Sequence, residues 1–139
     1  MPSPAEMSEV VRRAYEAFNR RDPAAFCELS APDIEIIDLS DMPGAETLCG
    51  HAGIERFFAD NWGTFDEVWG EVERILEAGP ARILALASHG GTARGGPRIA
   101  QARGVLVTFS ENGQMKEIRF FGDPREALTA AGLHEHDAG

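Results

Sequence analysis

Two residues could place reactive oxygen atoms inside the body of this protein. Tyr15 is the only tyrosine of the chain and lies on the apolar side of a helical pattern, so its ring is expected to point inward. Asp38 follows Ile34 and Ile36 with the alternation of a strand, which puts its carboxylate on the face that these side chains bury. A buried tyrosine hydroxyl needs a hydrogen-bond partner, and a carboxylate at the mouth of an apolar pocket is a candidate general base. The alternatives are a core tyrosine bonded to a backbone carbonyl, and a carboxylate that is solvated at a strand end or caps a turn at Ser40–Asp41.

Three further polar residues could reach the same interior. Gln101 and Arg103 share the alternation of Val105 on a long predicted strand. If this face is the inner one, Arg103 could polarise a carbonyl or epoxide oxygen, or bind a carboxylate through two hydrogen bonds. The alternative is a salt bridge on the outer or dimer face. His89 ends the preceding strand, where it could reach the rim of the pocket, and imidazole suits acid–base work near neutral pH.

Other signals are explained more simply without chemistry. His51 precedes a helix, where a structural role at the turn is favoured. The glycine-rich residues 90–96 (GGTARGG) lack the Gly-Lys-Ser/Thr ending of a phosphate-binding loop. His134 and His136 lie in a tail, residues 134–139, that is expected to fray and to support only adventitious metal binding. The sequence therefore predicts no metal site and no cofactor.

Composition narrows the class of protein. The 139 residues carry 23 acidic and 13 basic side chains, a net charge of −10, which argues against nucleic acid and anionic membranes as partners. No stretch approaches the ~20 apolar residues of a membrane span, and the first residues lack the features of a signal peptide. Cys27 and Cys49 have no redox-motif spacing and are expected to be reduced. We expect a cytoplasmic protein with one domain over residues 1–139.

The helices that must position these residues are marked by caps and apolar spacing. Ser3 and Glu6 form a capping box, with a proline between them, at the start of a long amphipathic helix. A short helix follows Asp22, and another short helix begins after Asp123. Between them, a third helix carries an aromatic stripe at helical spacing, from which Phe58 and Trp62 are expected to line the pocket.

Alternating patterns predict the strands, which occupy residues 33–38, 67–77, 82–89, 98–110 and 115–121. Residues 39–50 and 90–97 are expected to be loops, and Asn112–Gly113 predicts a type I′ hairpin turn. Four consecutive strands must pair antiparallel, with the helices covering one face of the sheet. Trp69 alternates with glutamates and so faces away from Val68 and Val72, which indicates a homodimer through the outer sheet face.

Several strings, in this order, resemble the SnoaL-like family of the nuclear transport factor 2 superfamily. They are residues 11–18 (VRRAYEAF), 50–58 (GHAGIERFF), 112–115 (NGQM) and 121–133 (FGDPREALTAAGL), with Asp22 and Pro32–Asp33 between them. The resemblance implies an α+β cone, in which three N-terminal helices and a short C-terminal helix accompany a curved antiparallel or mixed sheet around an apolar pocket. Tyr15 matches the oxyanion-donor tyrosine of ketosteroid isomerase-like members, and Asp38 matches their general-base aspartate. Val105 stands where those enzymes have a second acid, so steroid isomerisation itself is not expected.

The resemblance and the residues together predict a small-molecule pocket protein. We expect a cofactor-independent isomerase, cyclase or epoxide hydrolase acting on an apolar molecule that bears a carbonyl or an epoxide. Asp38 would be the general base, Tyr15 a hydrogen-bond donor and Arg103 a second electrophile or anchor. The residues expected to contact the substrate are Phe58, Trp62, His89, Gln101, Val105, Ile118 and Phe120. The alternative is a ligand-binding or dimeric interaction module of the same fold without enzymatic activity.

Overall fold

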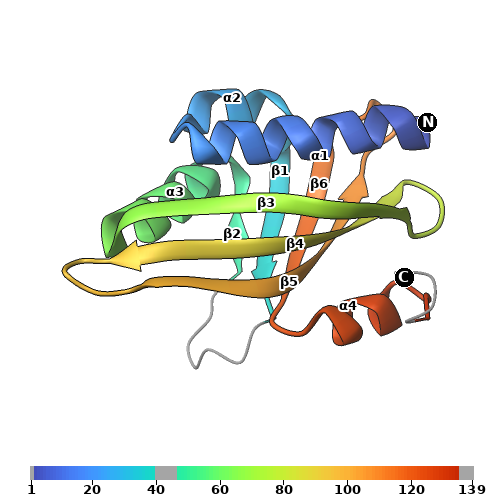
Figure 1. Cartoon of the computed structure of the whole chain (residues 1–139). Coiled ribbons are helices and arrows are strands. Elements are labelled where there is room, and N and C mark those ends of the chain that lie inside the picture. Colours follow the sequence, from blue (N-terminus) through green and yellow to red (C-terminus); the bar gives the residue numbers. More distant parts are fainter. Residues whose placement is uncertain (1, 40–46, 135–139) are drawn as a thin grey trace.

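The computed structural model describes residues 2–39 and 47–134, and within them it shows four helices and six strands (Figure 1). The helices are α1 (Pro4–Asn19), α2 (Pro23–Glu28), α3 (Gly50–Thr64) and α4 (Pro124–Ala130). The predicted caps are present. Ser3 and Glu6 form the capping box of α1, and the carboxylates of Asp22 and Asp123 accept backbone N–H bonds at the starts of α2 and α4. None of these helices is both long and apolar enough to cross a membrane.

The strands form one mixed sheet in the order β2-β1-β6-β5-β4-β3. They are β1 (Ser30–Asp38), β2 (Leu48–Cys49), β3 (Phe65–Glu77), β4 (Arg82–Ala93), β5 (Arg98–Phe109) and β6 (Met115–Phe121). β1 pairs with β6 in parallel, and the other neighbours pair antiparallel. The α+β class expected from the sequence is therefore confirmed.

The two faces of the sheet carry different helices. The face of Ile83 and Val105 packs against α1, α2 and α3, and the opposite face of Leu84 and Leu106 packs against α4 (Figure 1). The expectation that all helices cover one face is therefore wrong for α4. Gly104 explains the placement, because a Cβ there would lie 2.2 Å from the Cβ of Ala127 in α4, so only glycine allows this close approach.

Several predicted boundaries differ from the structure. β4 continues to Ala93, through residues 90–93 of the predicted glycine-rich loop, because Gly90 and Gly91 pair with residues of both β3 and β5. β2 lies within the predicted loop 39–50 and pairs with Glu35 and Ile36 of β1. The first strand begins at Ser30 instead of residue 33, and its register shifts between Ser30 and Glu35.

The turn between β5 and β6 is also not of the predicted type. A type I′ turn needs positive φ at both central residues, but of Asn112 and Gly113 only Gly113 has one, at 85°. The N–H of Gly113 donates to the carbonyl of Ser110 at 3.0 Å, and the N–H of Ser110 donates to that of Gln114 at 2.8 Å. The connection is therefore a three-residue loop, a type I turn followed by a left-handed glycine.

Candidate functional site

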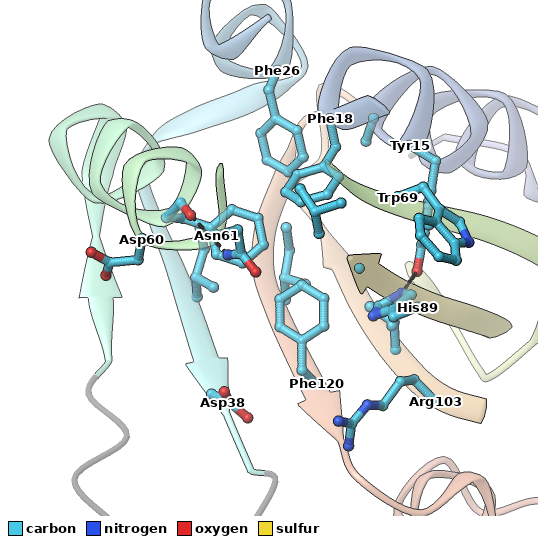
Figure 2. Close-up of a pocket in the computed structure, with 18 of the residues that line it drawn as sticks. Tyr15, Phe18, Phe26, Asp38, Asp60, Asn61, Trp69, His89, Arg103 and Phe120 are labelled. Atoms are coloured by element: carbon cyan, nitrogen blue, oxygen red, sulfur yellow. Dashed lines mark hydrogen bonds between the residues drawn. The ribbon is translucent and has the colours of Figure 1, made fainter. Parts of the chain in front are cut away.

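A cavity of about 740 Å³ lies between helices α1–α3 and the face of the sheet that they cover. Most of its wall is apolar, and its lining comes from all three helices and from all six strands. Its apolar lining includes Val11, Phe18, Ile36, Phe57, Val105, Ile118 and Phe120. Its polar lining includes Tyr15, Asp38, Asn61, His89, Gln101 and Arg103 (Figure 2). Few polar groups in a mostly apolar wall are typical of a site for a small organic ligand.

The central polar feature is a hydrogen bond between Tyr15 on α1 and His89 on β4. The Tyr15 hydroxyl and Nε2 of His89 lie 2.6 Å apart, and Figure 2 shows the two side chains pointing at each other. Burial raises the pKa of Tyr15 above its ordinary value. Burial, and next the charge of Arg103, lowers the pKa of His89 from 6.5 to about 4. At neutral pH the structure therefore holds a neutral phenol against a neutral imidazole.

In a neutral pair of this kind, one hydrogen is left over by the bond between the two side chains. Tyr15 has one O–H and neutral His89 has one N–H, and their mutual bond uses only one of the two hydrogens. If His89 donates from Nε2, the Tyr15 hydroxyl hydrogen is available. If Tyr15 donates, the available hydrogen is on Nδ1 of His89. The choice of tautomer thus decides which residue donates, but not whether the pair can donate.

The local backbone fixes the position of Tyr15. Gly70 of β3 lies against the tyrosine ring, and a Cβ at Gly70 would be only 2.5 Å from Cε1 of Tyr15. One helical turn later, the amide of Asn19 pairs with the same glycine, accepting from its N–H at 2.8 Å and donating to its carbonyl at 2.9 Å. Asn19 thus holds α1 against the edge strand β3, at the point where Gly70 leaves room for the ring of Tyr15. The sequence does not indicate this contact, because Asn19 and Gly70 lie 51 residues apart.

Asp38 is not brought together with Tyr15. It ends β1, pairs with Phe120 of β6 and is exposed where it borders the cavity. Figure 2 shows Phe120 between Asp38 and the Tyr15–His89 pair. The desolvated setting expected for Asp38 from strand alternation is therefore absent, because β1 ends there and the apolar wall does not continue around the carboxylate.

Arg103 and Gln101 stand on the inner wall of β5. Gln101 is the cross-strand partner of His89, Arg103 is that of Ala87, and both side chains border the cavity. Nη2 of Arg103 donates to Oε1 of Gln101 at 2.5 Å. Figure 2 shows Arg103 at the same end of the cavity as Asp38. Of the two orientations that alternation left open for Arg103, the structure has the inward one.

Two of the predicted cavity residues point elsewhere. Phe58 is 3% exposed and packs in the core, with its ring 5.4 Å from Phe18, and it does not line the cavity. Trp62 donates from Nε1 to the carbonyl of Phe18 at 3.2 Å, on the side of α3 that faces α1. Phe57 and Asn61, four residues apart on the same helix, border the cavity in their place. An aromatic stripe at helical spacing marks the buried side of a helix, but not which edge of that side borders a cavity.

The remaining predicted cavity residues do border the cavity. They are His89, Gln101, Val105, Ile118 and Phe120. Their contact with a ligand stays a prediction.

Other signals from the sequence have structural surroundings. Nε2 of His51 lies 3.3 Å from the carbonyl of Ser30, as expected for a residue that holds a turn. Cys27 and Cys49 are free thiols. Within residues 2–39 and 47–134, no three histidine, cysteine or carboxylate side chains gather as a metal site would need. His136, and the predicted turn at residues 40–41, fall outside those ranges.

Trp69 pairs with Gly90 of β4, and a Cβ on Gly90 would lie 2.2 Å from the indole ring. The two residues therefore share a face of the sheet, opposite to the one that Gly70 presents to Tyr15. The guanidinium of Arg98 lies 4.1 Å above the indole, a cation–π arrangement. Trp69 also borders the cavity, as do Gly70 and Gly90.

Comparison with known proteins gives consistent matches to one fold. A crystal structure of an NTF2-like protein of unknown function from Burkholderia pseudomallei is similar over 89% of this chain and 95% of its own, with 24% identity and a TM-score of 0.74. A putative SnoaL-like polyketide cyclase from Jannaschia is similar over 94% and 96%, with 19% identity and a TM-score of 0.73. The epoxide hydrolase/cyclase-like enzyme SalBIII, of pyran ring formation in salinomycin, is similar over 88% and 95%, with 20% identity and a TM-score of 0.73.

These identities are all low, so the structural matches show the fold and not the activity. No curated protein matches the chain in sequence. The SnoaL-like domain, however, matches residues 11–118, which include both members of the Tyr15–His89 pair and all of β1, β3, β4 and β5. The chain belongs to the SnoaL-like domain family.

Proposed function

We propose that this protein is a cofactor-independent enzyme that isomerises, cyclises or opens an apolar molecule bearing a carbonyl or an epoxide. The observation that carries the proposal is the half-buried 2.6 Å hydrogen bond between Tyr15 and His89 in the wall of an apolar cavity. The members of the pair lie 74 residues apart, and the fold brings them together beside a space that a ligand can fill. Relatives of the same fold that are named as a putative polyketide cyclase and an epoxide hydrolase/cyclase-like enzyme support the reaction class.

The pair would act on negative charge that develops on the substrate oxygen. When a proton leaves the carbon beside a carbonyl, the C–H electron pair moves into the new C=C bond and the oxygen becomes an enolate. The hydrogen that the pair keeps for a ligand is donated to that oxygen. Removing one such donor from an active site typically raises the barrier by ~3 kcal/mol. The lowered pKa of His89 keeps its ring neutral, so the pair donates a hydrogen bond without becoming an ion.

Asp38 would accept the proton at the mouth of the cavity. In isomerisation it returns that proton to another carbon, and in epoxide opening it takes a proton from the attacking water. Phe120 separates Asp38 from the Tyr15–His89 pair, so the substrate would lie along this ring with its oxygen toward the pair (Figure 2). The apolar rings of Phe57 and Phe120, stacked with centroids 5.5 Å apart, would form one wall for its carbon skeleton.

A second candidate function is ligand binding without turnover. The exposure of Asp38 favours it, because the sequence predicts a general base in an apolar pocket, whereas this carboxylate is exposed to water. In that case the Tyr15–His89 pair would fix the orientation of a bound ketone or epoxide and nothing further would happen to it.

Thermal unfolding in the presence of aromatic ketones and epoxides tests the first step, since a ligand of the folded state raises the melting temperature. Compounds that stabilise the protein are then incubated with it and examined for conversion by mass spectrometry and NMR. We expect Tyr15→Phe to slow conversion by about 100-fold or more, and Asp38→Asn to abolish it while leaving binding intact. Binding without conversion by the unmodified protein would support the second candidate, and unchanged conversion by Asp38→Asn would refute the assigned base.

A further inference from the structure

Arg103 is a cation on the cavity wall whose partner is neutral. Its guanidinium has five N–H donors, and the contact formed by one of its nitrogens is to the amide oxygen of Gln101. The other described arginines that form ion pairs do so with neighbouring carboxylates, as Arg56 does with Asp60 at 3.7 Å. Within residues 2–39 and 47–134, no carboxylate forms an ion pair with Arg103.

The position of Arg103 is held by the sheet and not by a charge. Its neighbours on the inner face are Val105 on its own strand and Ala87 across the β4–β5 ladder. The Gln101 amide, two residues earlier on the same face, orients the guanidinium. The side chain is half-buried, so its charge is only partly screened by water, and it acts on His89 as a cation.

From this geometry we propose that the cavity takes an apolar carboxylic acid, whose carboxylate binds Arg103 through two hydrogen bonds. The inference rests on the proposed function, since the apolar body of the acid would occupy the cavity described above. The guanidinium is planar, and two of its N–H donors can bind the two acceptor oxygens of a carboxylate in parallel. The Tyr15–His89 pair, which lies on the same side of Phe120 as Arg103, would receive a second polar group of the same molecule (Figure 2).

Two acidic residues on the cavity wall oppose anion binding, and their surroundings limit their effect. Asp60 is ion-paired with Arg56 on α3. Asp38 is exposed, so water screens its repulsion of a bound carboxylate. The half-buried guanidinium would bind the ligand's carboxylate through direct hydrogen bonds, whereas the charge of Asp60 is already paired and that of Asp38 is screened by water.

The test compares three probes of nearly equal shape: 2-naphthoate, the neutral 2-naphthamide and the ketone 2-acetylnaphthalene. Dissociation constants are measured by isothermal titration calorimetry at pH 7. We expect 2-naphthoate to bind about tenfold or more tightly than the amide, the usual advantage of hydrogen bonds to a charged group. Arg103→Gln should remove this preference without changing the affinity for the amide, which also reports that the cavity is intact.

Arg94→Gln is the matched control. It removes the same charge from the β4–β5 connection, where Arg94 is exposed and does not line the cavity, and the preference for the acid should persist. Should Arg103→Gln fail to fold, the comparison of acid and amide in the unmodified protein decides alone.

Equal affinities of acid and amide in the unmodified protein, or a preference that survives Arg103→Gln, would overturn the proposed acid site. Binding of the ketone and the amide in either case would leave the proposed function standing. If none of the three probes binds, the acid site is overturned, and the proposed function loses its support as well.

Discussion

The substitution Gly70→Ala tests most directly how the Tyr15–His89 pair is held. The φ angle of Gly70 is not among the positive ones, so the backbone itself accepts alanine. The added methyl group would lie 2.5 Å from Cε1 and 2.7 Å from Cδ1 of Tyr15. Carbon atoms that are not bonded pack at ~3.5–4.0 Å, so the tyrosine ring must retreat by about 1 Å. The same methyl group would be 3.4 Å from Cδ2 of His89, an ordinary van der Waals contact, so the strain falls on the tyrosine ring.

A displacement of this size is enough to lose the hydrogen bond. The Tyr15–His89 separation of 2.6 Å would approach or exceed the ~3.2 Å limit of a good hydrogen bond. Overpacking costs ~1–3 kcal/mol and the lost hydrogen bond about 1 kcal/mol, whereas the smaller backbone entropy of alanine returns ~0.5–1 kcal/mol. We therefore expect a loss of about 2 kcal/mol in the free energy of unfolding, or roughly 6–8 °C in melting temperature.

Two measurements separate this reasoning from general destabilisation. The melting temperature is compared with that of Gly63→Ala, in α3, where a Cβ meets no atom within 4 Å and alanine should stabilise the helix by ~0.5–1 kcal/mol. Because Tyr15 is the chain's only tyrosine, the absorbance change on tyrosine ionisation reports on this residue alone. Its pKa, raised by burial, should move back toward 10 in Gly70→Ala. An unchanged melting temperature with an unchanged tyrosine titration would refute the packing argument.

Three further predictions concern pH, the outer helix and assembly. The pKa of His89 is lowered from 6.5 to about 4, so the unfolded chain binds more protons within that range and stability should fall as the pH drops, by about 2 kcal/mol from pH 7 to 5. Urea unfolding of the protein and of His89→Gln checks this, and an equally steep fall in the variant would contradict it. Gly104→Ala places a methyl group 2.2 Å from Cβ of Ala127, so we expect α4 to shift and the protein to lose about 2 kcal/mol in denaturant unfolding, whereas unchanged stability would show that α4 adjusts freely. We also propose a homodimer through the sheet face of Trp69, which light scattering should detect and Trp69→Glu should weaken; a monomer at every concentration would exclude it.

Most of the secondary structure follows from local sequence, because caps and apolar periods act within a few residues. Ser3, Asp22 and Asp123 begin helices where expected, since each side chain satisfies a backbone N–H in its own first turn. Alternation also placed Gln101 and Arg103 on one face with Val105, since successive side chains of a strand point to opposite faces. These properties need no knowledge of the rest of the chain.

The candidate site depends on contacts that local patterns do not contain. The sequence indicates Tyr15 and His89 separately, but their hydrogen bond needs the approach of α1 to β4, which Gly70 allows and Asn19 stabilises. The rotation of α3 that presents Phe57 to the cavity is likewise set by the packing of all three helices.

The alternation of residues along a strand also does not predict how far the apolar wall of the cavity extends. It placed Asp38 on the inner face of β1, yet the carboxylate is exposed because the strand ends there. Local sequence thus predicts most of the elements and which side chains share a face. Which of those side chains meet depends on the packed fold, since burial and distance between remote segments arise only when the helices pack on the sheet.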